Sequence, residues 1–319
     1  NTQAFSNTGE GQVLGQSTVT LDTHGAAYDN TGGETLAVGN LNIYAGTLTN
    51  TTGLIRSAAT TTLSAANLVN SDTRGAEQGI EGQNVDITAQ SIVNKSGAIR
   101  ADQNTTLSSS GTIDNSAGLI SAGKVLTAKD PSAAKTLSVL NTGGTLVGGE
   151  NVVLDAGSVS WDGKLLSLQD MTLTVTRDIA FAAGSETVAN RNLTISTTGD
   201  ITNSGKLAAG NDLTLSARDI DNKATGDIQG KTTTLNASGT LTNRGVIDGG
   251  TTRINAGTLD NLGTGRIYGD WVAIGAGTLN NSAETVSGVA SAGTIAARTR
   301  LDIGAGTINN SNGALILSA

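Results

Sequence analysis

The sequence predicts an all-β fold, a parallel β-helix or β-solenoid, with three short strands per coil of about 20 residues and roughly 15 coils. The first observation behind this prediction is a motif of Gly, Thr, an aliphatic residue, any residue and Asn. Its clear copies are Gly46–Asn50, Gly111–Asn115, Gly239–Asn243, Gly257–Asn261, Gly277–Asn281 and Gly306–Asn310. A repeat of this length is typical of a solenoid, because one coil cannot bury its apolar side alone.

The second observation is strict alternation of apolar residues ahead of that motif. Leu41, Ile43 and Ala45 alternate with polar residues, as do Leu213, Leu215 and Ala217. A period of two is typical of a half-buried strand. The motif itself supplies a second extended piece, and a third follows the next glycine, as in Gly53-Leu54-Ile55. Stacked coils would pair equivalent strands in parallel at about 4.8 Å.

The recurring asparagine marks one corner of each coil. Asn tolerates turn conformations, and its side-chain amide can hydrogen-bond to the same residue of the next coil, which gives a ladder. We therefore assign a structural role, not a catalytic one, to the corner asparagines. They are Asn30, Asn50, Asn70, Asn94, Asn115, Asn203, Asn222, Asn243, Asn261, Asn281 and Asn310.

Composition and charge exclude several classes of function. The 319 residues are 37% hydrophobic but only 2% aromatic, which suits a narrow aliphatic interior. The net charge of −8 argues against nucleic acid and against docking to anionic lipid. No apolar run is long enough to insert into a membrane. Cysteine is absent, so a secreted form would have no disulfide framework.

The repeat is interrupted in four places. Residues 71–83, 129–136 and 282–292 lengthen coils at their corners, and we expect them to be projecting loops. In the stretch 160–190 the alternation continues but Trp161 stands in place of the corner asparagine, which predicts irregular coils. We interpret 1–319 as a single β-solenoid segment of a longer filament.

Reactive side chains do not gather anywhere in the repeat pattern. A polysaccharide-degrading β-helix needs two or three carboxylates facing one groove, whereas the acidic residues here are scattered among separate coils. His24 is the only histidine, so no histidine triad or multi-histidine metal site can form. The sequence therefore predicts no catalytic residues, no metal site and no cofactor.

One surface patch is a candidate for ligand binding. Exposed aromatic residues are common contact points for sugars and for protein partners. Tyr268 takes an outward strand position, with Arg266 and Trp271 nearby. We call Arg266, Tyr268 and Trp271 the aromatic patch. The alternative is that Trp271 folds over a corner and covers apolar surface.

The motifs GTLTN, GxIxAG, LTLSA and DIDN resemble the filamentous haemagglutinin repeats of bacterial two-partner secretion exoproteins. The resemblance covers essentially the whole chain and implies a right-handed β-helix. It also implies secretion through an outer-membrane β-barrel transporter to the surface of a Gram-negative bacterium. The Asn-Pro-Asn motifs of the family's secretion domain are missing, since Pro131 is the only proline. Nothing in the sequence resembles the family's globular toxin regions.

These observations favour a non-catalytic extracellular shaft of an adhesin or of a contact-dependent growth inhibition exoprotein, which displays a distal binding or toxin module. The alternative is a segment that itself binds a receptor or glycan on a host or bacterial cell through its projecting loops. A polysaccharide-degrading β-helix enzyme is a remote third alternative.

Overall fold

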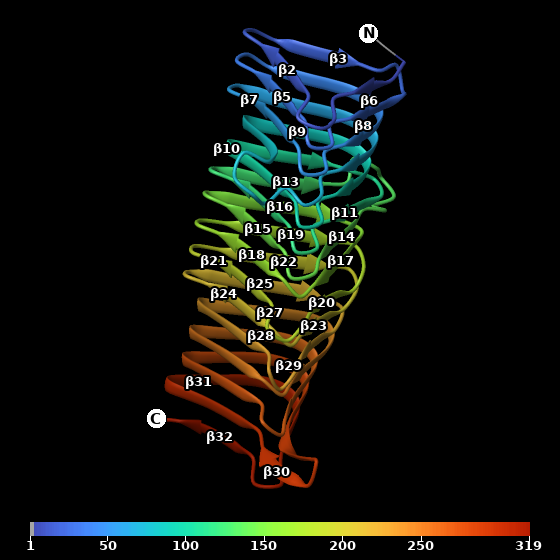
Figure 1. Cartoon of the computed structure of the whole chain (residues 1–319). Helices are drawn as coiled ribbons and strands as arrows, with labels where there is room; N and C mark the ends of the chain where they lie inside the picture. The colour runs from blue at the N-terminus through green and yellow to red at the C-terminus, as the bar shows by residue number, and fades with distance from the viewer. Residues whose placement is uncertain (1–2) are drawn as a thin grey trace. The chain divides into compact units, whose positions relative to one another are not determined.

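The computed structural model describes residues 3–319, none of which lies in a helix. The fold is a β-solenoid of about 16 turns with parallel strands, which confirms the predicted right-handed β-helix with coils of about 20 residues. The chain divides into two compact units, Asn1–Leu168 and Gln169–Ala319. Figure 1 shows successive turns stacked within each unit.

Most strands are short, and three successive faces make one turn. The strands of the first unit are β1 (Phe5–Ser6), β2 (Gln12–Gly15), β3 (Val19–Asp22), β4 (Ala27–Asp29), β5 (Glu34–Ala37), β6 (Leu41–Thr49), β7 (Leu54–Ser57), β8 (Thr60–Val69), β9 (Gly79–Val93), β10 (Ala98–Ser108), β11 (Thr112–Asp114), β12 (Leu119–Ala122), β13 (Val125–Lys129), β14 (Ser138–Asn141), β15 (Thr145–Gly148), β16 (Asn151–Ala156), β17 (Ser158–Trp161) and β18 (Lys164–Ser167).

The second unit has longer strands, because several run around the corners without a break. They are β19 (Met171–Val175), β20 (Ile179–Phe181), β21 (Glu186–Ala189), β22 (Leu193–Thr197), β23 (Ile201–Asn203), β24 (Lys206–Ala209), β25 (Asp212–Ala217), β26 (Ile220–Asn222), β27 (Asp227–Asn243), β28 (Val246–Leu262), β29 (Arg266–Val286), β30 (Val289–Ala292), β31 (Thr294–Asn310) and β32 (Leu315–Ser318).

Parallel pairing between turns follows the apolar alternation. In β6 and β8, Leu41 lies beside Thr61 and Ile43 beside Leu63. Leu41 and Ile43 are fully buried, as the alternation predicted. Gly46 allows β6 to turn the corner, because a Cβ there would lie 2.0 Å from the carbonyl oxygen of Gly25 in the preceding turn. Only glycine fits such a close backbone approach.

The corner asparagines form two hydrogen-bonded ladders, one in each unit. In every link the side-chain amide Nδ2 donates to Oδ1 of the asparagine one turn later, for example from Asn30 to Asn50 at 2.8 Å and from Asn222 to Asn243 at 2.8 Å. All eleven asparagines named from the sequence take part. All of them are fully buried except Asn310, which is exposed at the end of the second ladder.

The first ladder has two members that the sequence analysis missed. Asn7 donates to Asn30 at 2.7 Å, and Asn141 accepts from Asn115 at 2.8 Å. Neither follows a Gly-Thr-aliphatic run, although Asn141 has a glycine three residues later, as Asn50 does. Next in register after Asn141 is Trp161, which fills the corner position with a buried indole. In the second unit, Phe181 fills the corner position beside Asn203.

Buried threonines occupy some interior positions that hold an aliphatic residue in other turns, as Thr61 does beside Leu41. The side chains of Thr61, Thr105 and Thr233 are fully buried. Each hydroxyl donates to a backbone carbonyl oxygen in the next turn, at 2.7, 2.8 and 2.7 Å respectively. A buried hydroxyl costs little free energy when it is hydrogen-bonded. The interior therefore tolerates polar residues wherever a corner carbonyl lies within reach.

Candidate functional site

The aromatic patch does not form a single cluster. Trp271 lies on an outward position of β29, with the guanidinium carbon of Arg253 4.9 Å and that of Arg300 5.1 Å from its ring centroid. Arg253 belongs to the preceding turn and Arg300 to the next one, so the indole is stacked between two cations. Its Nε1 donates to Asp302 Oδ2 at 2.7 Å. Neither face of the ring is free for a sugar to stack on.

The charges beside Trp271 strengthen this arrangement. Arg300 Nε lies 2.7 Å from Asp302 Oδ2. Hydrogen bonds from Arg300 and then from Trp271 hold the pKa of Asp302 below its ordinary value. An indole between guanidinium groups gains about 0.5–1 kcal/mol per contact at exposed sites. The partners of Trp271 are thus charged side chains of the two adjacent turns, and not the apolar surface that the alternative interpretation expected.

The other two members of the aromatic patch also contact the solenoid itself. Arg266 Nη1 donates to the carbonyl oxygens of Gly265 at 2.9 Å and Ala292 at 3.0 Å. Tyr268 is half-buried on β29 and lies beside Ala296 of the next turn. Within residues 3–319, no recorded hydrogen bond, ion pair or ring contact joins the three side chains of the aromatic patch to one another. The structure thus gives Arg266 and Trp271 internal partners.

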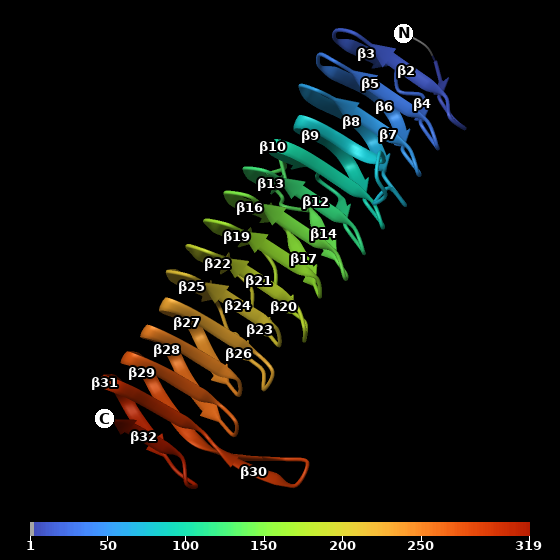
Figure 2. The same ribbon diagram turned by 60° about the vertical axis from the view of Figure 1, so that its left-hand side comes forward.

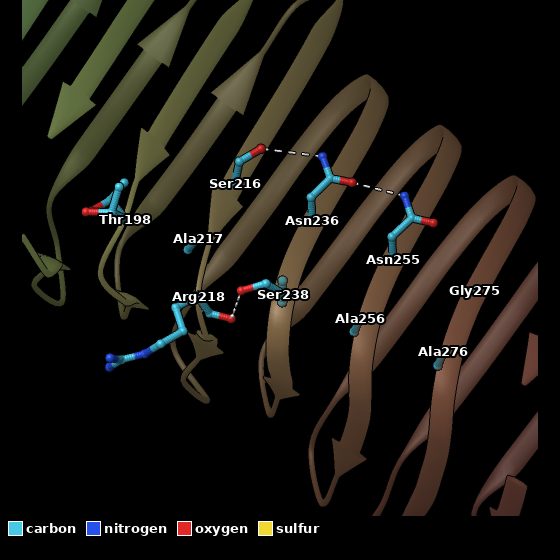
Figure 3. A pocket seen from close by; sticks show the side chains of 12 residues that line it. Thr198, Ser216, Ala217, Arg218, Asn236, Ser238, Asn255, Ala256, Gly275 and Ala276 are labelled. Atoms are coloured by element: carbon cyan, nitrogen blue, oxygen red, sulfur yellow. Dashed lines mark hydrogen bonds between the residues drawn. The ribbon is translucent and has the colours of Figure 1, made fainter. Parts of the chain in front are cut away.

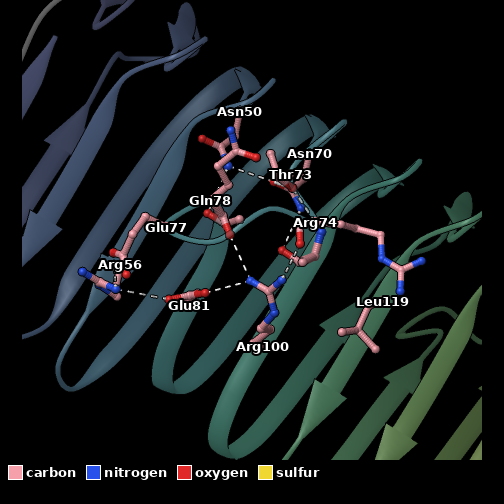
Figure 4. Close-up of polar contacts among 12 residues, drawn as sticks. Asn50, Arg56, Asn70, Thr73, Arg74, Glu77, Gln78, Glu81, Arg100 and Leu119 are labelled. Atoms are coloured by element: carbon pink, nitrogen blue, oxygen red, sulfur yellow. Dashed lines mark hydrogen bonds and ion pairs between the residues drawn. The ribbon is translucent and has the colours of Figure 1, made fainter. Parts of the chain in front are cut away.

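The stretch 71–83 contains a loop that is fastened to the first unit. Residues 71–78 lie outside the strands, whereas 79–83 belong to β9. Arg100 Nη1 donates to the carbonyl oxygen of Gln78 at 3.0 Å and its Nη2 to that of Arg74 at 3.3 Å. Arg56 lies 3.0 Å from the carboxylate of Glu77 (Figure 4). Two outward arginines therefore clamp the loop from different turns.

The stretch 129–136 is a turn organised around a buried aspartate. Asp130 Oδ1 accepts from the backbone N–H of Ser132 at 2.7 Å, and Oδ2 accepts from that of Leu137 at 2.6 Å. Burial opposes ionisation of Asp130, but these hydrogen bonds outweigh it and lower its pKa. Lys135 pairs with Asp155 at 2.6 Å. These side chains fix the turn.

The stretch 282–292 contains a β-hairpin. The last four residues of β29, 283–286, pair with β30 in antiparallel fashion, and the two strands extend away from the turns of the second unit (Figure 2). Val286 and Val289 flank the hairpin's turn and are 62% and 67% exposed. Glu284 pairs with Arg244 through two hydrogen bonds of 2.7 and 3.0 Å. The hairpin is the most prominent departure from the repeat in the second unit.

A shallow groove of about 800 Å³ runs across turns of the second unit (Figure 3). Beside it lies a column of polar side chains, in which Asn236 donates to Ser216 at 3.4 Å and Asn255 donates to Asn236 at 3.0 Å. Its floor is a row of alanines, namely Ala217, Ala237, Ala256 and Ala276. The one charged lining residue, Arg218, pairs with Asp200. The groove offers amide and hydroxyl groups but no acid–base pair.

Carboxylates from neighbouring turns meet around arginines, as Asp200 and Asp219 do at Arg218. Among residues 3–319, no three His, Cys, Asp or Glu side chains are placed to hold a metal ion. His24 lies in a turn, with Nδ1 3.5 Å from the carboxylate of Asp22. The same residues contain no helix long and apolar enough to cross a membrane.

The family model for the haemagglutinin repeat matches residues 6–90, 80–130, 117–160, 162–205, 181–263 and 272–319. The chain belongs to the haemagglutinin repeat family. This match confirms the resemblance inferred from the Gly-Thr-aliphatic-x-Asn motif. The haemagglutinin repeat segments do not cover residues 264–271, which carry the aromatic patch. The parallel register of the repeat nevertheless continues through the patch, at Arg266, Ile267 and Trp271.

A curated relative is described as "Deoxyribonuclease CdiA" from Dickeya dadantii (strain 3937). It is 29% identical over 133 residues, which are 36% of this chain and 4% of the relative. The haemagglutinin repeats seen here thus correspond to a small part of that protein. No solved structure shows a significant match to this chain.

Proposed function

We propose that this chain is a shaft segment of a secreted filamentous exoprotein, of the adhesin or contact-dependent growth inhibition type. In this proposal residues 1–319 are one solenoid segment of a longer filament, and the shaft does no chemistry of its own. It holds a binding or toxin module, located elsewhere in the longer protein, away from the cell surface.

The observation that carries the proposal is the buried asparagine ladder. Within each unit it repeats the same links of 2.6 to 2.9 Å from turn to turn, and residues 3–319 contain no group of three His, Cys, Asp or Glu side chains placed to hold a metal ion. A structure built from equivalent turns is extended by adding turns, and its stability is approximately a sum over repeats and their interfaces. That property suits a spacer and contributes nothing to catalysis.

The proposal includes a route of export and a location. Haemagglutinin repeats and the CdiA relative support secretion through an outer-membrane β-barrel transporter to the surface of a Gram-negative bacterium. The absence of cysteine is consistent with this route, because a disulfide formed in the periplasm would prevent the chain from threading through a pore unfolded.

Deletion of one whole turn tests the shaft role. Removing residues 223–243 joins Asn222 to Arg244 and keeps the ladder in phase, because Asn222 and Asn243 are equivalent corners. We expect the longer exoprotein to keep its display at the cell surface and its target-cell binding or killing. The matched control removes 223–233, which breaks the phase and should abolish display. Loss of target-cell activity in the in-phase deletion, with normal display, would overturn the proposal.

A second candidate function is direct contact with a receptor or glycan on a target cell. The observation that favours it is the 283–292 hairpin, which leaves the repeat and exposes two valines. Its test is binding of the purified chain to bacterial and epithelial cells, beside variants in which 71–78 or 283–292 is shortened. Saturable binding that is lost with one of these segments would assign the contact to it. The third alternative, cleavage of a polysaccharide, is not favoured, because carboxylates that meet in the described turns, such as Asp248 and Asp270, are paired with an arginine.

A further inference from the structure

The 283–292 hairpin differs from the rest of the described chain in its strand pairing and in the number of neighbouring strands. Every other pairing described within the two units is parallel, and adjacent turns cover both edges of most strands. In the hairpin the pairing is antiparallel, from Ala283 with Ala292 at the base to Val286 with Val289 at the tip. The turn between the two strands consists of Ser287 and Gly288, which have φ values of 52° and 80°. Within residues 3–319, β30 has β29 as its only partner strand. One edge of β30 is therefore bare.

The hairpin is held in a fixed position, which lowers the entropy that binding would cost. Arg244, from an earlier turn, forms a two-point ion pair with Glu284. Arg266 donates to the carbonyl oxygen of Ala292 at 3.0 Å, and Gly293 N–H donates to the carbonyl oxygen of Ser282 at 3.1 Å. The two ends of the hairpin are thus closed against each other at its base.

The bare edge carries backbone groups that can pair with another strand. Val286 and Val289 flank a two-residue turn and so form a hydrogen-bonded pair. By alternation, the N–H and C=O of Ala290 then face outward from β30. A strand edge with unpaired N–H and C=O groups is a template for another strand. Such pairing requires backbone alignment and tolerates a wide range of small side chains.

The sequence of β30 is compatible with pairing to itself. An antiparallel pair of β30 strands has a two-fold axis, which can place Ala290 opposite Ala290 and Val289 opposite Ser291 of a second copy. The strand has no charge and no proline, so it lacks the devices that usually protect an edge. The nearest charge on the hairpin, Glu284, is already paired with Arg244.

The exposed valines favour the same contact. Val286 and Val289 share one face of the hairpin, beside a cavity of about 210 Å³ that Ala224 and Thr264 also line. Pairing through β30 would bring the valines of two hairpins onto one face of a four-stranded sheet. Three or more strands with an apolar face are needed for independent stability, and a single hairpin falls short of that.

We propose that the 283–292 hairpin links this chain to a second copy of itself by edge-to-edge pairing of β30 strands. The contact is smaller than the roughly 1,200 Å² typical of stable complexes, so it is weak for two isolated chains. Many copies standing side by side on one surface would raise its effective strength through multivalency. The inference goes beyond the shaft role, because it gives the filament lateral contacts with its neighbours.

The absence of cysteine makes a direct test practicable. Ser291→Cys introduces a single thiol on β30, to be labelled with pyrene. We expect excimer emission that rises with protein concentration over a dilution series. The matched control is Thr194→Cys, at an exposed position of β22, which should give monomer emission throughout. Equal excimer emission from the two labels would mean non-specific association and would overturn the proposal.

Blocking the edge completes the experiment. Ala290→Pro removes the outward N–H without changing charge. Combined with the labelled Ser291→Cys, it should abolish the excimer. Val289→Lys should do the same by placing like charges near each other. Circular dichroism of both variants checks that the solenoid is intact. Edge pairing would be refuted by undiminished excimer emission in folded Ala290→Pro. It would also be refuted if the labelled parent gave no excimer emission at any concentration. Neither result bears on the shaft role.

Discussion

Asn50 donates its side-chain amide to Oδ1 of Asn70 at 2.8 Å, and both side chains are fully buried. Asn50 also accepts from Asn30 in the preceding turn, so each side chain links the turns on either side of it. The same Nδ2 lies 3.2 Å from the carbonyl oxygen of Gly53 and 3.1 Å from that of Gly79. One corner residue thereby satisfies both its own polar atoms and those of its neighbours.

Replacing one asparagine of the ladder should be strongly destabilising. Asn50→Ala removes two links of the ladder, the one from Asn30 and the one to Asn70. Asn30 Nδ2 keeps two backbone acceptors, and Asn70 Oδ1 keeps the hydroxyl of Thr73 as a donor. Each lost hydrogen bond costs about 0.5–1.5 kcal/mol, so the free energy of unfolding should fall by roughly 1–3 kcal/mol. Urea unfolding followed by circular dichroism measures the loss. Asn67→Ala, an exposed asparagine on β8, is the control and should change stability by less than about 0.5 kcal/mol. Equal losses would contradict the ladder's role.

The glycine that follows the corner asparagine should be equally intolerant of substitution. A Cβ on Gly265 would lie 2.4 Å from the carbonyl oxygen of Asn243 and 2.5 Å from Asn261 Oδ1. Gly265→Ala should therefore destabilise the second unit by about 1–3 kcal/mol or more, as forced overpacking does. Gly304→Ala is the matched change, because nothing lies within 4 Å of its Cβ position. Thermal unfolding of the two variants should separate them clearly, and similar melting temperatures would refute the steric account.

The sequence was sufficient to predict the features that repeat. The alternation of Leu41 and Ile43 predicts an inward row, and the period of the corner asparagines predicts stacking, because both signals depend only on local spacing. Trp161 and Phe181 also occupy corner positions, but Phe181 carries no signal that distinguishes it from an ordinary strand residue.

The features that depend on several turns at once could not be predicted. Trp271 is stacked between Arg253 and Arg300, which lie far apart in the sequence and meet it only through the register of three turns. The pairing of Arg244 with Glu284 likewise depends on where a hairpin extends after it leaves the solenoid. Sequence periodicity identifies which residues point outward, but not which outward side chains contact one another.

Two buried threonines should respond in opposite directions to the same substitution. Thr233 and Thr187 are both fully buried in the second unit. The hydroxyl of Thr233 donates to the carbonyl oxygen of Asp248 at 2.7 Å, whereas that of Thr187 has no hydrogen-bond partner. Thr233→Val should cost about 1 kcal/mol, and Thr187→Val should stabilise the protein by a similar amount. Urea unfolding of both variants tests this contrast, and a loss of stability in Thr187→Val would reveal a partner for its hydroxyl.

The ion pair at the base of the hairpin should make the hairpin's stability depend on pH. The hydrogen bond from Arg244 holds the pKa of Glu284 below its ordinary value. The stabilisation is therefore complete above the unfolded pKa of about 4.3 and is lost as the pH falls through the lower, folded pKa. Both side chains are partly exposed, so the effect should be about 1 kcal/mol or less. Amide hydrogen exchange of the hairpin residues at neutral pH should be faster in Glu284→Gln than in the parent protein.

At a pH well below the folded pKa of Glu284, the parent carboxyl is protonated and neutral, as the glutamine amide of the variant is. The two proteins should then exchange their hairpin amides at similar rates when compared at the same pH, which cancels the intrinsic pH dependence of exchange. Glu186→Gln, which alters a carboxylate on β21 at a distance from the hairpin, should leave the hairpin rates unchanged throughout. A difference between Glu284→Gln and the parent that persists in acid would show that Glu284 holds the hairpin by its shape and not by its charge.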